Sequence, residues 1–158
     1  MKKLSITLLL ILLTIGSIHA QHNPAPWTLT TKKVSACEYD LIFTVNIDKG
    51  WHIFSIVKSK SDGVPPTEII FDASKEYTPE GNLTESKPVS EYDKTISTSV
   101  SVHYTKAVFT QRIKLNTTGK IKITGTHESQ VCDNEKCLTP PIDKFSFDVQ
   151  GSVCSIKK

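Results

Sequence analysis

The strongest constraint on the fold is an alternation of apolar and polar residues with a period of two. From Leu41 to Ile47, an apolar side chain occupies every second position. The same parity returns in residues 109–115, 121–123 and 145–149, with Gln111 as a polar exception. Because successive side chains of a strand point to opposite faces of its sheet, this pattern predicts half-buried β-strands. No long run has helical periodicity, so we expect an all-β protein.

Turn-forming residues separate the runs and divide the chain into short expected strands. These are residues 27–34, 38–47, 51–58, 67–72, 95–103, 107–115, 119–127 and 142–149. Such a series in one domain predicts a two-sheet β-sandwich of immunoglobulin-like type, with a small β-barrel as the alternative. Residues 73–94 are rich in Ser, Thr, Glu, Lys and Pro, and we expect a long irregular loop there.

The N-terminus has the pattern of a secretory signal peptide. Lys2 and Lys3 precede an almost wholly apolar run, and a short segment then ends in Ala20. The run falls short of the ~20 apolar residues that a membrane-spanning helix needs. We therefore expect residues 1–20 to be cleaved after about Ala20, leaving residues 21–158 as one exported domain. The short basic start is typical of bacteria and indicates the periplasm.

The charge of the chain gives no reason to expect nucleic acid as a partner. The formal net charge of +3 falls to +1 when Lys2 and Lys3 are removed with the leader. A nearly neutral domain with interspersed charges lacks the basic surface that binds phosphates.

Cys132 and Cys137 are separated by a turn-forming segment, Asp133 to Lys136. In a straight strand the two cysteines would lie about 16 Å apart, whereas a disulfide needs Cα atoms about 4.4–6.8 Å apart. Asp and Asn favour turn conformations. A hairpin would place the two cysteines opposite one another, at a spacing that a disulfide can bridge.

Cys37 and Cys154 are better placed for a structural cross-link. In the loop-entropy model, closing the short Cys132–Cys137 loop stabilises by about 2 kcal/mol, and closing the long loop by about 5 kcal/mol. Cys37 ends the first expected strand and Cys154 follows the last. These ends meet in an immunoglobulin-like sandwich, so we expect a Cys37–Cys154 disulfide in the oxidising compartment.

The spacing of Cys132 and Cys137 leaves three interpretations open. A structural disulfide is favoured by spacing alone. A redox pair is possible because a hairpin loop can open without unravelling the fold. A metal carrier using Cys132, Cys137 and His127 is the third, although zinc sites usually have four ligands and no second pair is present. We therefore expect no metal.

Three segments together resemble the periplasmic N-terminal domain of the thiol:disulfide interchange protein DsbD. They are Gly50-Trp51-His52-Ile53-Phe54-Ser55, Val64-Pro65-Pro66-Thr67 and the unit from Cys132 through Cys137 to Pro140-Pro141. The resemblance covers about residues 30–150, and the cysteine unit is its most specific part. It implies an immunoglobulin-like fold and a redox-active pair, in which Cys137 attacks a partner disulfide and Cys132 resolves the mixed disulfide.

The resemblance also implies a role in protein-disulfide reduction, including cytochrome c biogenesis. The electron donor would be a thioredoxin-like or membrane-embedded protein, and the acceptors would be oxidised periplasmic thioredoxin-fold proteins. Because this chain ends at Lys158, we expect the donor to be a separate chain. No cofactor is implied. The rival function is an exported adhesion or binding sandwich whose disulfides are purely structural.

Further residues gain roles from the same resemblance. Members of the family cover the pair with a cap loop, and residues 91–94 resemble it, with Tyr92 as the cap aromatic. The chain departs from the family in lacking an aromatic just before Cys132, and Cys37 and Cys154 have no counterpart. Trp51 and Phe54 are expected between the sheets. His52 could aid thiol deprotonation, but a hydrogen bond at a sheet edge is the simpler expectation.

Overall fold

The computed structural model describes residues 23–59, 64–94 and 97–152. The expected signal peptide, residues 1–20, and Cys154 lie outside these ranges. Every regular element in the described ranges is a β-strand. In that part of the chain, no helix is long and apolar enough to cross a membrane.

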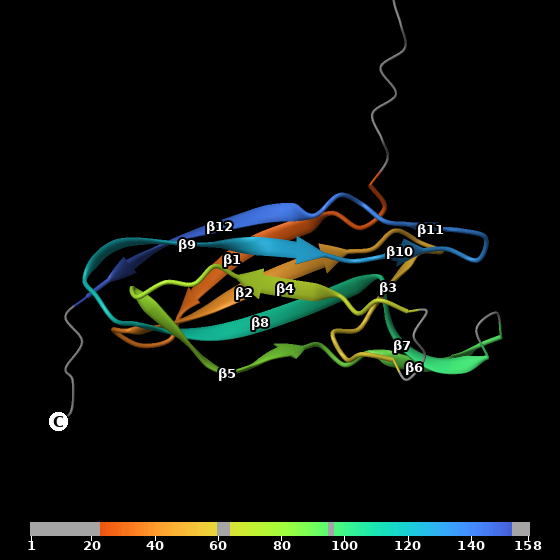
Figure 1. Cartoon of the computed structure of the whole chain (residues 1–158), viewed down its shortest axis with the longest axis horizontal. Coiled ribbons are helices and arrows are strands. Elements are labelled where there is room, and N and C mark those ends of the chain that lie inside the picture. The colour runs from red at the N-terminus through yellow and green to blue at the C-terminus, as the bar shows by residue number, and fades with distance from the viewer. Residues whose placement is uncertain (1–22, 60–63, 95–96, 153–158) are drawn as a thin grey trace, which may run out of the picture.

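The strands form three antiparallel sheets, which we call sheets A, B and C (Figure 1). Sheet A has the order β1 (Trp27–Lys33), β2 (Glu38–Asn46), β8 (Lys106–Leu115) and β5 (Tyr77–Glu85). Sheet C has the order β12 (Asp143–Gly151), β9 (Gly119–Glu128) and β4 (Glu68–Phe71). Sheet B has the order β11 (Cys137–Leu138), β10 (Val131–Cys132), β3 (His52–Phe54), β7 (Thr98–Tyr104) and β6 (Val89–Asp93).

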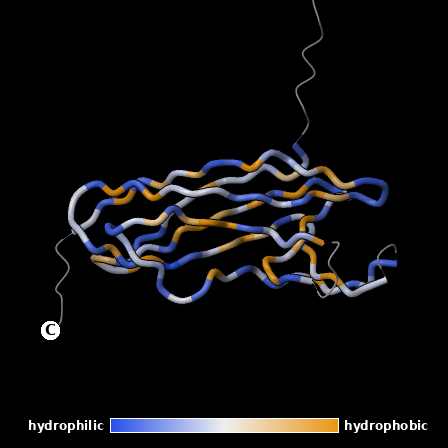
Figure 2. Tube along the Cα trace, in the orientation of Figure 1, coloured by the Kyte–Doolittle hydropathy of each residue, from blue (hydrophilic) through white to orange (hydrophobic). Residues whose placement is uncertain are grey.

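Sheets A and C enclose the main hydrophobic core. The predicted alternation is realised in β2 and β9, whose apolar residues are buried while the residues between them are more exposed. Figure 2 shows the same alternation of hydropathy along the strands. The Phe43 ring of sheet A packs edge-on against Phe145 and Phe147 of sheet C, with centroid distances of 5.0 and 5.2 Å. This packing confirms the immunoglobulin-like sandwich, and the open sheet edges exclude a closed barrel.

Sheet B lies at one end of the long axis and extends the expected two-sheet description (Figure 1). Its strands continue those of the sandwich: β10 follows β9 after two residues, and β7 leads into β8 through Thr105. Thr105 has a positive φ of 62°, which marks the change of direction between the two strands. Sheet B therefore positions the cysteine hairpin at the end of a rigid scaffold.

The expected loop at residues 73–94 is wrong, because it contains β5 and β6. Both strands lie at sheet edges, where little of the strand is buried and the alternation of apolar residues is weak. The edge position also tolerates Pro79, which lacks an amide hydrogen. The pairing of β5 with β8 shifts register between Glu80 and Thr84, and Gly81 has a positive φ of 68° there. The turn-forming residues near Gly81 therefore belong to a β-bulge and do not end the strand.

The hydrogen bonds of Gln111 explain why a polar residue interrupts the apolar pattern of β8. The residue is 4% exposed, and its side-chain amide donates to the carbonyl oxygens of Glu80 and Arg112 at 3.2 and 2.8 Å. The irregular register beside it leaves carbonyl groups without ladder partners. A buried amide therefore satisfies the polar groups of the bulge.

Candidate functional site

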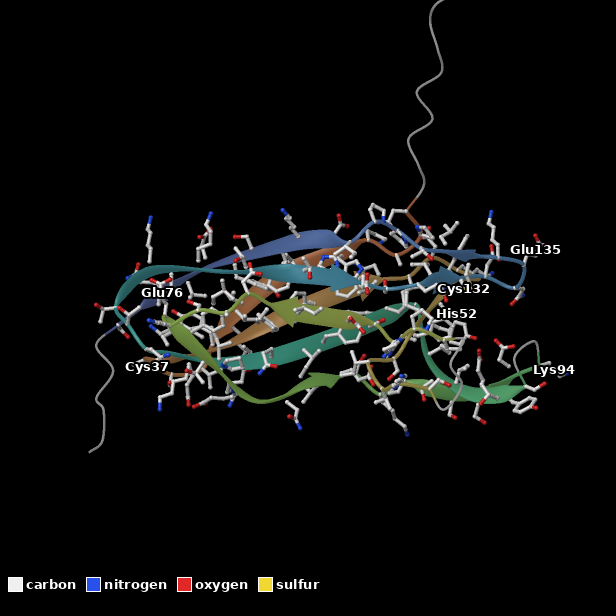
Figure 3. The ribbon with its side chains drawn as sticks, viewed as in Figure 1. Cys37, His52, Glu76, Lys94, Cys132 and Glu135 are labelled. Carbon is white, nitrogen blue, oxygen red and sulfur yellow. A yellow bond between two sulfur atoms is a disulfide. The ribbon has the colours of Figure 1, made fainter. Side chains whose placement is uncertain are left out.

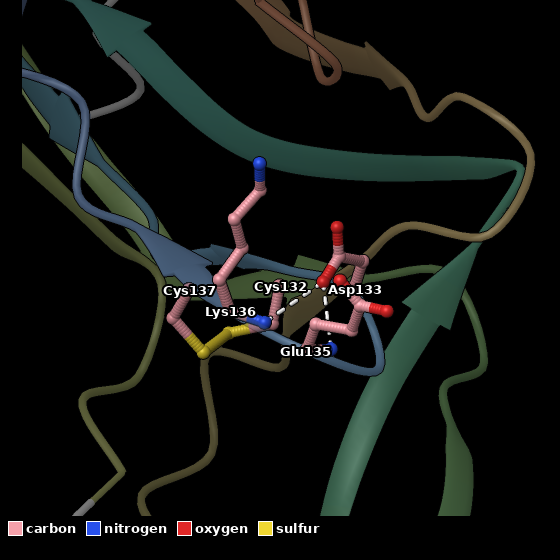
Figure 4. Close-up of a disulfide and its surroundings, with 5 residues drawn as sticks. All are labelled: Cys132, Asp133, Glu135, Lys136 and Cys137. Carbon is pink, nitrogen blue, oxygen red and sulfur yellow. Dashed lines mark hydrogen bonds between the residues drawn. A yellow bond between two sulfur atoms is a disulfide. The ribbon is translucent and has the colours of Figure 1, made fainter.

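The predicted cysteine hairpin is present at the tip of sheet B. Cys132 and Cys137 are register partners on β10 and β11, and they form a disulfide with Cα atoms 4.0 Å apart. The Asp133 amide donates to the Lys136 carbonyl at 2.9 Å. The Asp133 carboxylate accepts hydrogen bonds of 2.8 Å from the amides of Glu135 and Lys136 (Figure 4). These two backbone bonds lower the pKa of Asp133, and the turn is held by bonds that do not involve sulfur.

The two cysteines differ in exposure. Cys132 is 2% exposed and belongs to a small apolar cluster that we call the disulfide-end cluster: Phe54, Val64, Val100, Val102 and Cys132. Cys137 is exposed and lies on β11, a two-residue strand at the edge of sheet B. Pro140 and Pro141 follow closely, and neither can donate an amide hydrogen to a longer ladder. Cys137 is therefore the more accessible of the two cysteines.

An open groove of about 270 Å³ borders the disulfide. We call it the disulfide groove, and its wall includes His52, Phe54, Val64, Asp93 and hairpin residues 132–137. The three segments that carry the family resemblance, far apart in sequence, thus meet at one surface. The groove has room for a few side chains of a partner beside the exposed sulfur.

A row of side chains crosses sheet B from the disulfide. His52 is the register partner of Cys132 on one side and of Tyr104 on the other. Directly opposed residues of antiparallel strands project from the same face of the sheet. The Tyr104 hydroxyl then donates to Glu91 at 2.8 Å. Because β3 lies between β10 and β7, the sheet-edge position expected for His52 is wrong.

Burial and acidic neighbours act in opposite directions on His52. Desolvation is the larger effect and lowers the pKa of His52, while Glu91, Asp93 and Asp133 raise it. Burial and the hydrogen bond to Glu91 raise the pKa of Tyr104 to about 12. Both rings are therefore neutral near pH 7.

Tyr92 lies on β6, and its side chain is 61% exposed. The register of β6 with β7 places Glu91 and Asp93 on the same face as the His52–Tyr104 row, and Tyr92 on the other face. Asp93, and not Tyr92, contributes to the described wall of the disulfide groove. The cap role of Tyr92 stays a prediction.

The expected packing of two aromatics holds for Trp51 and is wrong for Phe54. Trp51 is half-buried against the main core, and Lys136 Nζ lies 5.9 Å from its ring centroid. Phe54 is buried in the disulfide-end cluster instead of between sheets A and C. It is register partner to Val102, so it packs against the groove side of sheet B.

His127, the candidate third ligand of the metal interpretation, lies in the main core. Its ring stacks on Trp27 with a centroid distance of 4.1 Å, and the residue is 7% exposed. Within the described residues, no group of three or more His, Cys, Asp or Glu side chains is arranged to hold a metal ion.

Sequence reasoning missed a buried polar cluster behind sheet B. Glu85 accepts from Ser55 Oγ at 2.5 Å and from the Ile56 amide at 3.2 Å. The same carboxylate lies 2.8 Å from His103 Nε2, and the two side chains are 9% and 2% exposed. These contacts end the strand expected at residues 51–58 after Phe54. No spacing signal links Glu85 to His103, because their pairing depends on the missed strand β5.

The predicted Cys37–Cys154 disulfide stays a prediction, because Cys154 lies outside the described residues. Ser152 Oγ donates to the carbonyl of Ala36 at 2.6 Å, which brings the last described residue beside Cys37. Figure 3 shows Cys37 and Cys132 at opposite ends of the long axis.

The fold and the site together define an all-β sandwich with a disulfide hairpin at one end. No protein-family model matches the chain, and no curated protein matches it in sequence. Among solved structures, the N-terminal periplasmic domain of ScsB from Proteus mirabilis is similar with a TM-score of 0.55 and 17% sequence identity. The match covers 83% of this chain and 48% of that one, so the chain spans about half the length of the ScsB structure.

The N-terminal domain of DsbD from Neisseria meningitidis, in its reduced form, matches with a TM-score of 0.49 and 15% identity. That match covers 87% of this chain and 96% of the other. The fold expected from the resemblance to the N-terminal domain of DsbD is confirmed by the likeness to the ScsB domain.

Proposed function

We propose that this chain is a periplasmic thiol:disulfide exchange domain. Its Cys132–Cys137 pair passes reducing equivalents to oxidised exported proteins. The observation that carries the proposal is the asymmetry of the disulfide: Cys132 is 2% exposed, while Cys137 lies exposed on an edge strand beside an open groove. A structural cross-link gains nothing from one accessible sulfur, whereas exchange requires it.

The exchange uses two steps. The Cys137 thiolate attacks one sulfur of the partner's disulfide, and the partner's other sulfur leaves as a thiolate. Cys132, once deprotonated, then attacks Cys137 Sγ, which re-forms the Cys132–Cys137 bond and releases the partner's second thiolate. The partner gains two electrons and the domain loses them, so no cofactor takes part.

The cellular setting follows from the same proposal. Residues 1–20 direct export and are cleaved after about Ala20, leaving residues 21–158 in the periplasm, the compartment named for the ScsB domain. The electron donor is a thioredoxin-like or membrane-embedded protein. The acceptors are oxidised thioredoxin-fold proteins, including those of cytochrome c biogenesis.

The test is a trapping experiment with single cysteine variants. Cys132→Ser should leave Cys137 able to attack but should prevent release, so mixed disulfides should accumulate with an oxidised periplasmic thioredoxin-fold bait. Cys137→Ser should accumulate few or none. Non-reducing electrophoresis after an acid quench measures both, and circular dichroism establishes that each variant is folded.

Other outcomes lead to other functions. Trapping by Cys137→Ser alone would reverse the two roles. If neither variant traps any bait and the disulfide resists mild reductants, the pair is structural and the chain is an adhesion or binding sandwich. Structural disulfides typically have reduction potentials below about −300 mV.

A further inference from the structure

In the resolving step, the buried thiol of Cys132 must lose its proton before it can attack. A thiol attacks only as its thiolate, and an unperturbed cysteine has a pKa of about 8.5. Cys132 is 2% exposed among Phe54, Val100 and Val102. Apolar surroundings disfavour the charged thiolate. The buried thiol therefore needs a nearby group that can take its proton.

One described side chain on the same face of sheet B is suited to that task. His52 is the direct register partner of Cys132, so their Cβ atoms are about 5 Å apart. Both residues contribute to the wall of the disulfide groove, and Figure 3 shows His52 beside Cys132. The contacts of His52 with the rings of Phe54 and Tyr104, each at a centroid distance of 5.6 Å, hold it in this place.

We propose that His52 is the proton acceptor for the resolving thiol of Cys132. This role rests on the proposed exchange function and adds a named residue to it. His52 takes the proton from Cys132 Sγ, and the resulting thiolate attacks Cys137 Sγ of the mixed disulfide. The Cys137–partner bond breaks with its electron pair going to the partner's sulfur. His52 then returns the proton to that thiolate or to solvent.

The charges around His52 suit a transient imidazolium. Glu91 and Asp93 face it from β6, Asp133 faces it from the hairpin turn, and the Tyr104 hydroxyl points to Glu91. Glu135 and Lys136 also contribute to the groove wall. Burial keeps the resting ring neutral, and the three carboxylates stabilise the cation once the proton arrives. A neutral proton acceptor beside the thiol, whose cation is stabilised by acidic neighbours, suits general-base catalysis.

The two steps of exchange can be timed separately with dithiobis(nitrobenzoate). Attack by Cys137 on this aromatic disulfide releases one coloured thiolate, and resolution by Cys132 releases the second. In stopped-flow experiments with the reduced protein near pH 7, His52→Gln should slow the second release by about 100-fold, a common contribution of a positioned general base. The first release should keep its wild-type rate. The control is His127→Gln, which replaces a buried histidine outside the groove and should leave both phases unchanged.

Chemical rescue and the pH profile separate proton transfer from a packing role. Free imidazole should restore the second release in His52→Ala but have no effect on the wild-type protein. In the wild-type protein the second rate should level off above the pKa of His52, whereas unaided thiolate formation rises tenfold per pH unit towards about pH 8.5. This profile needs no variant, so it tests the role even if position 52 tolerates no change.

An unchanged second release in folded His52→Gln, or a wild-type rate that rises steadily to pH 8.5, would overturn the role of His52. The exchange function would stand in either case, because both thiolates would still be released in sequence. If Cys137→Ser released the first thiolate as fast as the wild-type protein, the exchange function itself would fail. The two failures are therefore distinguishable.

Discussion

The sandwich end and the disulfide end of the molecule differ in how their apolar residues are buried. The main core draws fully buried rings and aliphatic side chains from sheets A and C, with Phe43 packing against five other rings, among them Phe71 and Phe145. The disulfide-end cluster is small, and one of its members is Cys132 itself. The comparison predicts that the sandwich end supplies most of the stability, and that opening the disulfide at the other end costs little of it.

The largest effect should come from the main core. Phe43→Ala should lower the free energy of unfolding by about 3–5 kcal/mol, because it removes contacts across both sheets and leaves a cavity. Urea denaturation followed by tryptophan fluorescence measures the loss. Phe54→Ala is the matched change at the disulfide end and should cost less, since Phe54 borders an open groove that solvent can enter. Equal losses would contradict the division between the two ends.

The buried pair behind sheet B should give the next largest effect. His103→Leu removes one of the hydrogen-bond partners of the largely buried Glu85 carboxylate, which should cost about 3 kcal/mol. The double variant His103→Leu/Glu85→Gln should recover part of that loss, because a neutral amide costs less to bury with a missing partner than a carboxylate does. Urea midpoints of the three proteins test this order, and a double variant less stable than His103→Leu would refute it.

The smallest effect should come from the disulfide. Opening the short loop should lower the free energy of unfolding by only about 2 kcal/mol. The far-ultraviolet circular dichroism should not change, since the hairpin turn is also held by Asp133. Comparing the wild-type protein with Cys132→Ala/Cys137→Ala by urea denaturation measures the difference. A loss as large as that of Phe43→Ala would show that the disulfide supports the fold.

The central strands could be predicted from sequence because one face of each strand packs on the core and the other is more exposed. β2, β8 and β9 each bury one face, and a strand with one buried face has alternating apolar and polar residues. β5 and β6 could not be predicted, since edge strands bury too little to leave that pattern. Sheet B was not expected as a separate sheet, because β3, β7 and the predicted cysteine hairpin come from distant parts of the chain and only tertiary pairing joins them.

The candidate site likewise has features that could be predicted from sequence and features that could not. The hairpin could be predicted, because Asp133 and the fixed distance between the cysteines are local properties of the sequence. The neighbours of the hairpin could not, since the pairing of His52 with Cys132 joins residues eighty positions apart in the chain. Family resemblance supplied the expectation that these segments belong together, but not the register that sets His52 against Cys132.

The bonds of Asp133 have a consequence for the reduced protein. Because they close the turn without sulfur, they keep the two thiols near each other after the disulfide opens. Each thiol then meets the other at a high effective concentration, much as in a well-oriented intramolecular reaction. The turn already restricts the conformations of the chain between the two cysteines. Re-forming the disulfide therefore costs little further conformational entropy. A turn that favours ring closure makes the dithiol the stronger electron donor in the proposed exchange, and one carboxylate and two amides contribute part of that tendency.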